Sequence, residues 1–365
     1  MTTRYKVAQW ATGDTGRRAL REVIGHPDME LVGVLVYDEA KEGKDAGELC
    51  GEEPTGVLAT RDRKAILDLG ADCVVYMPRA TGSGRTRAGL TQEELLDDIV
   101  PLLASGTSIV TTCTDLLARG VRLGPEGQAR VQEACEKGKS SIWPSGSDPG
   151  FFTETFPFAL LSVQRHIDLI ELEEFGDLSH RPSPHMVMEQ MRFGKPVDGW
   201  DPDRRKNHLY GEYQPALTVL ADAAALDVDE WTATGGVAAA REDVSIYAGV
   251  VEKGTAAAQK VVITGRREGV DVIRFTQYAF VTRDVDPHWD LRDTGWRLRI
   301  HSDAPFDIQM PLPVSLDVLA DHVPAYNANG PVNAIPYVCA ARPGILTTTD
   351  LPPILPRGPR PGGLA

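Results

Sequence analysis

The first stretch with residues suited to chemistry is VAQWATGDTGRRAL, residues 7–20. Ala11, Gly13 and Gly16 stand where the three glycines of the pattern G-x-G-x-x-G would stand. In that pattern the second glycine lets the backbone approach phosphates, and the third lets a helix pack closely on a strand. A tight turn without a ligand would also explain these residues. If the turn binds a dinucleotide pyrophosphate at a helix N-terminus, the expected contacts are Gly13, Asp14, Thr15, Gly16 and Arg17.

Asp38 follows the next apolar run, about twenty residues beyond the turn, where an acid can bind the adenosine ribose hydroxyls. A carboxylate there favours NAD over NADP because it repels a 2′-phosphate. Lys41 and Lys44 leave that choice open, since either ammonium could bind a phosphate, and Asp38 could also be a solvated surface acid. We therefore expect NAD or NADP. Further cofactor contacts are expected at the ends of later strands, at Pro78 and Thr112.

Composition limits the remaining classes of function. The 365 residues are 42% hydrophobic and 25% charged, with a net charge of −14, which disfavours nucleic acid or an anionic membrane as a partner. The five cysteines show no C-x-x-C spacing, so we expect reduced thiols in the cytoplasm rather than disulfides or a zinc site. No apolar run reaches the ~18–20 residues of a membrane span. No His, Cys or Asp cluster has metal-ligand spacing.

Residues 1–150 alternate short apolar runs with amphipathic stretches. Strands alternating with helices of this length predict a parallel sheet with helices on both faces, so the predicted fold class is α/β with a Rossmann-type doubly wound domain. Ligands bind such sheets at the carboxyl ends of the strands. Strands are expected over residues 6–11, 30–37, 72–77, 108–113 and 141–146.

The pattern changes after residue 150. Residues 151–314 contain long runs with period-two alternation, which predict an α+β substrate domain with a mostly antiparallel sheet. Helices are expected at 183–194 and 213–227. Within 315–346 a helical pattern returns and extends to residue 330, and the segment VNAIPYVCAARPG follows it. Residues 347–365 are rich in Pro and Gly, so we expect a flexible tail.

Four short motifs occur in an order that resembles a known family. They are WATGDTGRRAL at 10–20, GKDAGEL at 43–49, GSDPGF at 146–151 and VNAIP at 332–336. The sequence resembles dihydrodipicolinate reductase-type proteins, in the branch that contains 2,4-diaminopentanoate dehydrogenase and the native amine dehydrogenases. The similarity runs over nearly the whole chain except the tail.

The resemblance implies reversible reductive amination, in which a ketone or aldehyde, ammonia and reduced cofactor give an amine. It also implies that 315–346 completes the dinucleotide-binding domain, that Asn333 hydrogen bonds the nicotinamide carboxamide, and that the substrate-domain sheet forms a homodimer. The resemblance implies that true dihydrodipicolinate reductases use a loop with two histidines and several lysines where the second domain begins. Here the matching region, EEFGDLSHRPSPHMVMEQ, has no lysine, which argues against that reaction.

Amination needs a group that keeps ammonia neutral and moves protons, and a carboxylate serves if burial raises its pKa above the usual ~4. The resemblance implies that related amine dehydrogenases place a glutamate just after the fifth strand, in a Cys-Glu-Glu-Leu-like stretch. This chain has Cys113, Thr114, Asp115 and Leu116 there. Asp115 is therefore the candidate acid/base, with a side chain one methylene shorter. Its alternative role is the N-cap of a short helix.

His180 is the second catalytic candidate, because a histidine beside an imine can exchange protons near neutral pH. It could equally be a solvated loop residue. Two residues expected in the substrate pocket have structural alternatives. Asp148 stands before a proline, where aspartate commonly forms a turn, and Met186 could simply fill the core. The matched motifs contain no obvious arginine clamp, which favours a substrate without a carboxylate, although Arg79, Arg181 and Arg192 weaken that inference. The residues expected to line the substrate pocket are Cys113, Thr114, Ser147, Asp148, Phe151 and Met186.

The sequence therefore favours an NAD(P)-dependent amine dehydrogenase acting on a small or medium ketone, aldehyde or amine. One alternative is an imine or carbonyl reductase that does not use ammonia. The other is a dinucleotide-binding regulatory protein without catalysis, because the family's glutamate is absent.

Overall fold

The computed structural model describes residues 4–78 and 90–356. The chain divides into two compact units. Unit 1 comprises Met1–Phe151 and Val323–Ala365, so it is assembled from two separate segments of the chain. Unit 2 comprises Phe152–His322. Within the described residues, no helix is long and apolar enough to cross a membrane.

Unit 1 contains a seven-stranded sheet in which every pairing is parallel, with the order β16-β6-β5-β4-β1-β2-β3. The strand order reverses between β1 and β4, and ligands of such sheets bind beside that point at the carboxyl ends of the strands. The predicted Rossmann-type fold is confirmed. The strands are β1 (Tyr5–Trp10), β2 (Met29–Leu35), β3 (Ala59–Thr60), β4 (Cys73–Tyr76), β5 (Ser108–Thr111), β6 (Ser141–Pro144) and β16 (Gly344–Ile345).

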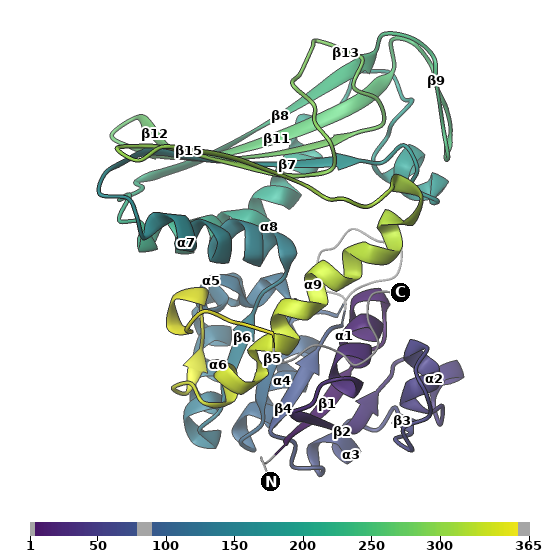
Figure 1. Cartoon of the computed structure of the whole chain (residues 1–365), viewed down its shortest axis with the longest axis vertical. Helices are drawn as coiled ribbons and strands as arrows, with labels where there is room; N and C mark the ends of the chain where they lie inside the picture. Colours follow the sequence, from purple (N-terminus) through teal and green to yellow (C-terminus); the bar gives the residue numbers. More distant parts are fainter. Residues whose placement is uncertain (1–3, 79–89, 357–365) are drawn as a thin grey trace. The chain divides into compact units, whose positions relative to one another are not determined.

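Helices cover both faces of this sheet (Figure 1), which explains why its central strands are continuous apolar runs. On one face, α4 and α6 pack on Val74 and Ile109. On the other, α1 and α9 pack on Val7 and Val75. The helices are α1 (Asp14–Ile24), α2 (Ala46–Cys50), α3 (Arg63–Leu67), α4 (Gln92–Ala104), α5 (Leu117–Gly120), α6 (Gly124–Gly138) and α9 (Leu316–Cys339).

Helix α9 is longer than its sequence indicates. The pattern predicts a helix up to residue 330 and a separate segment after it, yet the helix continues to Cys339 through Pro324, Pro331 and Pro336. Each proline removes one backbone donor and disfavours the preceding turn. Burial of Val332 and of the helix positions around it against the sheet offsets that cost.

Unit 2 is built on a second seven-stranded sheet with the order β13-β8-β11-β12-β7-β14-β15. Its pairings are antiparallel except β12 with β7, so the sheet is mixed. A separate hairpin joins β9 (Val244–Ile246) and β10 (Gly249–Val251). The strands of the large sheet are β7 (Ile167–Asp177), β8 (Glu230–Ala240), β11 (Ala256–Arg267), β12 (Val270–Phe280), β13 (Val285–Asp286), β14 (Gly295–Ser302) and β15 (Phe306–Pro311).

Helices α7 (Phe156–Leu161) and α8 (Pro202–Ala223) lie along one face of this sheet (Figure 1). Ile273 and Phe275 of β12 point to that face, and Phe275 stacks on Tyr213 of α8 with ring centroids 4.3 Å apart. The opposite face carries charged pairs, and farther along the strands it carries the apolar cluster around Phe175 and Phe280. Glu171 of β7 lies in register between Arg274 of β12 and an arginine of β14, and it pairs with Arg274 at 2.8 Å.

Two predicted helices of unit 2 have other bounds. The expected helix over 183–194 is a short helical turn, His185–Gln190. The helix expected from residue 213 begins at Pro202, because the Asp201 side chain accepts a hydrogen bond from the amide of Asp203 and proline suits the first helical position.

Residues 347–356, at the start of the expected flexible tail, make specific contacts with unit 1. Asp350 accepts hydrogen bonds from the amide and hydroxyl of Thr347 and pairs with Arg119 and Arg342. Leu351 and Ile354 pack against the apolar cluster beneath α9. Pro- and Gly-rich composition does not reveal such contacts, because they depend on partners elsewhere in the chain.

The Asp350 contacts predict a pH-dependent contribution to stability. Burial raises the pKa of Asp350, but the hydrogen bonds from Thr347, Arg342 and Arg119 outweigh it and lower the pKa to about 2. The stabilisation is therefore present above the unfolded value near 4 and is lost as the pH falls toward about 2. Asp350→Asn should lower the free energy of unfolding by about 1 kcal/mol at pH 7 and by about half as much at pH 3.

Urea unfolding at the two pH values measures this difference. Asp68→Asn is the matched control, because Asp68 forms an exposed pair with Lys64 in the same unit and should have little effect at either pH. Equal stability of Asp350→Asn and the unmodified chain at pH 7 would contradict the assignment.

Candidate functional site

The turn between β1 and α1 depends on a close approach of helix and strand. Ala11 occupies the first glycine position with a left-handed φ of 73°. A Cβ on Gly16 would lie 2.2 Å from the carbonyl oxygen of Ala11, so only glycine fits there. The buried Gln9 side chain donates from Nε2 to the same carbonyl at 2.9 Å. Sequence reasoning missed Gln9, although a polar residue inside an apolar strand is a signal for such a role.

The N-terminus of α1 is open to an anion. Gly13 is exposed, and a Cβ added to it would meet no atom within 4 Å. Among the described residues, no side chain caps this helix. The amides of Asp14, Thr15 and Gly16 have no acceptor within the helix, because the first turn lacks preceding carbonyls. These features fit a bound pyrophosphate, since the amides and the helix dipole both favour negative charge.

Asp38 and Lys41 lie beside this turn at the end of β2. Asp38 is exposed, and its Oδ1 accepts a hydrogen bond from the amide of Ala40 at 3.0 Å. The ammonium of Lys41 donates to the carbonyl of Thr12 at 2.8 Å and lies 3.2 Å from the Thr12 hydroxyl. Lys44, by contrast, pairs with Glu48 at 3.1 Å. Of the two lysines near Asp38, Lys41 is therefore the one at the turn.

A buried polar network anchors the residue before Asp38. The hydroxyls of Tyr37 and Tyr76 both donate to Oδ2 of Asp98, at 3.2 and 2.9 Å, and Arg63 pairs with its Oδ1 at 2.8 Å. Trp10 donates from Nε1 to the Tyr37 oxygen at 2.9 Å. Burial raises the pKa of Asp98 above its usual range. The network fixes Tyr37 at the carboxyl edge of the sheet while leaving 42% of the residue exposed.

Pro78 and Thr112 follow the neighbouring strands β4 and β5. Pro78 is buried directly after Met77, and the Thr112 hydroxyl lies 3.2 Å from the sulfur of Met77. Both proposed cofactor contacts are thus at the same edge of the sheet as the turn.

Asp115 lies in the short helical turn Thr114–Leu116 that follows β5. It is 6% exposed, and its Oδ1 is 3.4 Å from Nη2 of Arg122. Cys113, not Asp115, occupies the N-cap position of the turn. Burial, with the Asp115 charge as a second cause, raises the pKa of Cys113 to about 12, so this thiol stays protonated. Sequence reasoning missed Arg122, because its partner depends on how the chain folds back after residue 116.

The segment after β6 is held by helix α9. Oδ1 of Asn327 accepts hydrogen bonds from the amide and the hydroxyl of Ser147, at 3.0 and 2.8 Å. Asp148 follows, with a cis peptide bond to Pro149, and Phe151 is 41% exposed. Asn333, expected in a returning segment, lies inside α9 and is partly buried.

His180 and Met186 belong to unit 2. Nδ1 of His180 is 2.6 Å from Oδ1 of Asp317, and both side chains are exposed. Met186 packs beside the buried Phe175 and Phe193, as core residues do. Arg181 and Arg192 flank the same helical turn and are partly buried, whereas Arg79 lies outside the described residues.

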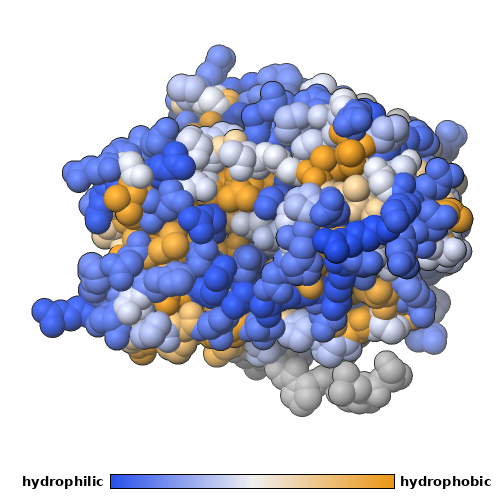
Figure 2. Space-filling model, turned by 90° about the horizontal axis from the view of Figure 1, so that it is seen from above, coloured by the Kyte–Doolittle hydropathy of each residue, from blue (hydrophilic) through white to orange (hydrophobic). Residues whose placement is uncertain are grey.

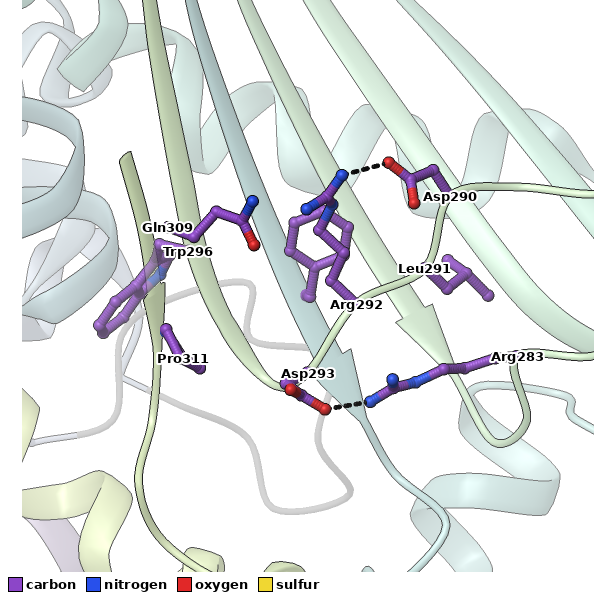
Figure 3. Close-up of a pocket in the computed structure, with 9 residues that line it drawn as sticks. Arg283, Asp290, Leu291, Arg292, Asp293, Trp296, Gln309 and Pro311 are labelled. Carbon is purple, nitrogen blue, oxygen red and sulfur yellow. Dashed lines mark hydrogen bonds and ion pairs between the residues drawn. The ribbon is translucent and has the colours of Figure 1, made fainter. Parts of the chain in front are cut away.

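Unit 2 also contains a pocket of about 290 Å³ that no sequence pattern indicated (Figure 3). Two ion pairs border it, Arg283 with Asp293 at 2.5 Å and Arg292 with Asp290 at 2.6 Å. The pocket shares no residue with the expected substrate pocket. It is lined by Phe175, Arg283, Asp290, Leu291, Arg292, Asp293, Trp296, Gln309 and Pro311.

Unit 1 therefore gathers most of the predicted site residues at one edge of its sheet, the carboxyl ends of β1, β2, β4, β5 and β6. His180 and Met186 belong to the other unit. In residues 4–78 and 90–356, no three His, Cys, Asp or Glu side chains are grouped so that they could hold a metal ion.

Comparisons with known proteins agree with this arrangement. Residues 10–84 match the family described as dihydrodipicolinate reductase, N-terminus. A relative named amine dehydrogenase, from Streptomyces virginiae, is 36% identical over 191 residues, which are 52% of this chain and 51% of the relative. The chain thus matches about half the length of that curated relative.

Two solved structures share the fold. An amine dehydrogenase from Mycobacterium smegmatis has a TM-score of 0.70 at 16% identity, covering 97% of each chain. A probable dehydrogenase from Thermotoga maritima has a TM-score of 0.50 at 10% identity, covering 94% of this chain and 92% of the other. These findings confirm the resemblance that the motifs predict, to dihydrodipicolinate reductase-type proteins and among them to amine dehydrogenases.

Proposed function

We propose that this protein is an NAD(P)-dependent amine dehydrogenase that interconverts a small or medium ketone or aldehyde, together with ammonia, and the corresponding amine. The observation that carries the proposal is the buried carboxylate of Asp115 at the same sheet edge as the open N-terminus of α1. The relative named amine dehydrogenase supports the same reaction class.

The residues present fit a nicotinamide dinucleotide. The first turn of α1 would bind the pyrophosphate, Asp38 the adenosine ribose, and Pro78 and Thr112 the adjoining part of the cofactor. Asn333 would hydrogen bond the nicotinamide carboxamide. When bound, the cofactor supplies hydride transfer, and the protein must position the substrate and exclude water.

Asp115 is the proposed acid/base. Its carboxylate accepts a proton from ammonium, so that neutral ammonia can attack the carbonyl, and it returns a proton as water leaves the carbinolamine. Arg122 keeps the carboxylate in place through the 3.4 Å ion pair. His180, oriented by Asp317, is the proposed second proton carrier. The substrate would contact Cys113, Thr114, Ser147, Asp148, Phe151 and Met186.

The proposal predicts ammonium-dependent oxidation of NADH or NADPH. Absorbance at 340 nm is followed with a panel of ketones and aldehydes, each with and without ammonium. Turnover only with ammonium would support amine dehydrogenase activity. Oxidation that does not need ammonium would indicate the imine or carbonyl reductase, and cofactor binding without any turnover would indicate a regulatory protein.

Asp115→Asn tests the role of the carboxylate in the same assay. The variant should lose amination by ~10²-fold or more, yet retain reduction of a preformed cyclic imine, which needs no ammonia. Asp350→Asn, which also breaks a carboxylate–arginine pair in unit 1, serves as the control and should leave the rate of amination unchanged. Loss of both reactions in Asp115→Asn would assign this residue to structure or hydride positioning.

We further propose that the cofactor site accepts a 2′-phosphate through Lys41. Its ammonium lies at Thr12 of the turn, while the Asp38 carboxylate is turned toward the amide of Ala40. A 2′-phosphate on the adenosine ribose would lie between Asp38 and the turn. The Lys41 ammonium would then pair with this phosphate, which is a stronger, charged partner than the Thr12 carbonyl.

Lys41→Gln should therefore raise the Kd of NADPH by ~10-fold and leave that of NADH nearly unchanged. Fluorescence titration with each cofactor measures both constants. Lys44→Gln is the matched control, since Lys44 pairs with Glu48. Equal weakening of both cofactors by Lys41→Gln would mean that Lys41 only supports the turn.

We also propose that the protein is a cytoplasmic homodimer. Its two copies would meet at the charged face of the unit 2 sheet. On that face Glu171 and Glu173 alternate with Arg274 and Arg299 on the neighbouring strands, which gives a surface of balanced charge. The view from above shows a mostly hydrophilic surface with separate apolar patches (Figure 2).

Sedimentation velocity should then give twice the mass of one chain. Thr234→Arg, at an exposed position of β8 on that face, should shift the protein toward monomer because it adds a long, unpaired positive side chain to the proposed interface. Asp222→Arg on the exposed side of α8 is the control. If the unsubstituted protein sediments as a monomer, the proposed interface is ruled out.

A further inference from the structure

Two cysteines lie side by side in unit 1 although they are far apart in sequence. Cys73 is the first residue of β4 and is fully buried. Cys339 is the last residue of α9 and is partly exposed. Both belong to the apolar cluster between α9 and the sheet. The end of α9 therefore rests on the beginning of β4.

The hydrogen bonds of the two thiols show how near they are. Cys339 donates from Sγ to the carbonyl oxygen of Asp72 at 3.6 Å, and that carbonyl belongs to the peptide bond leading into Cys73. Sγ of Cys73 lies 3.8 Å from the carbonyl of Val74. Both sulfurs are thus held at the same short stretch of backbone, residues 72–74.

Their exposure gives the two thiols different reactivity. Burial, followed by the hydrogen bond and charge of Cys339, raises the pKa of Cys73 well above that of an ordinary thiol. Cys73 is thus protonated and shielded from solvent. Cys339 is the member of the pair that a small oxidant in water can reach, because thiol reactivity requires access.

We propose that Cys73 and Cys339 form a redox-modification site at which a hydroperoxide converts two thiols into a disulfide. Cys339 reduces the peroxide O–O bond, giving a sulfenic acid and one molecule of alcohol or water. The Cys73 sulfur then attacks the sulfenic sulfur, the S–O bond breaks, and the thiol proton leaves with the hydroxyl as water. Two electrons pass from the two sulfurs to the peroxide, and a dithiol reductant reverses the change.

The position of the pair indicates what the disulfide does. Cys73 is at the amino end of β4, whereas the dinucleotide turn and Asp115 are at the carboxyl edge of the sheet. The bond would fix the last turn of α9 to the centre of the sheet and close a very long loop of chain. Crosslinks of this kind stabilise mainly by restricting the unfolded chain. We therefore infer a change in stability rather than in cofactor binding.

The other three cysteines offer a contrast within the same chain. Cys50 is in α2, Cys113 follows β5 and Cys135 is in α6, and all three are buried. Burial raises the pKa of each of these thiols. They should remain reduced under peroxide concentrations that oxidise the pair.

Peptide mapping of the full-length protein tests the proposal. The reduced protein is treated with hydrogen peroxide, alkylated under denaturing conditions with iodoacetamide, digested and analysed by mass spectrometry. The expected product is a linked peptide pair containing Cys73 and Cys339, two hydrogens lighter than the separate peptides. The midpoint of thermal unfolding should rise by several degrees, and dithiothreitol should reverse both changes.

Cys339→Ser should abolish the linked peptide and the thermal shift, and Cys50→Ser should preserve both. Recovery of Cys339 as a sulfinic or sulfonic acid with Cys73 still alkylated would overturn the proposal. A disulfide between other cysteines would also overturn it. The same holds if peroxide leaves the thiols of Cys73 and Cys339 unchanged. The readouts require no turnover, so they stand apart from the test of amine dehydrogenase activity.

Discussion

The close approach of α1 to β1 is the constraint on which the nucleotide-binding unit depends. Gly16 lies against the Ala11 carbonyl at a distance that no side chain permits, and Ala11 accepts a left-handed backbone conformation to place that carbonyl. A non-glycine residue in that conformation costs of order 1–3 kcal/mol. Gln9, buried beneath the turn, satisfies the carbonyl with its amide. Together these residues leave the helix N-terminus open at the edge where the parallel strands end.

Charged groups buried near that edge are each matched by an arginine. Asp98 has Arg63 and two tyrosine hydroxyls, and Asp115 has Arg122. An isolated charge in such surroundings would cost several kcal/mol, so it must be paired or neutral. The consequence is that the side chains around the proposed cofactor and substrate positions are held by partners from other elements. Positions fixed in this way are suited to orienting a substrate.

Unit 2 separates its roles between the two faces of one sheet. The face under α7 and α8 is apolar, with one buried polar network in which Gln277 links Arg205 with Glu174 and Tyr213. Burial raises the pKa of Glu174 and lowers that of Arg205. The other face carries paired charges beside the apolar cluster around Phe175 and Phe280. Because side chains alternate along each strand, a single set of strands can support a core and present a charged surface.

The sequence by itself determined the fold class, the five strands β1, β2, β4, β5 and β6 of the first 150 residues, and the glycine turn, whereas the short elements α2, β3 and α3 were not predicted. These features follow from local patterns, because short apolar runs that alternate with amphipathic stretches predict the strands and helices of a parallel sheet. The motifs also carried the resemblance to dihydrodipicolinate reductase-type proteins. The sequence likewise placed the candidate residues Asp38, Asp115 and Ser147 at strand ends.

Only the tertiary structure decided which side chains meet. Lys41 reaches Thr12, Arg122 pairs with Asp115, and Asn327 holds Ser147, although no local pattern links these pairs. The same holds for α9, which continues through three prolines because its buried face packs on the sheet. Such contacts join segments far apart in the chain. They depend on the register and packing of whole elements, a property that the spacing of residues along one segment does not contain.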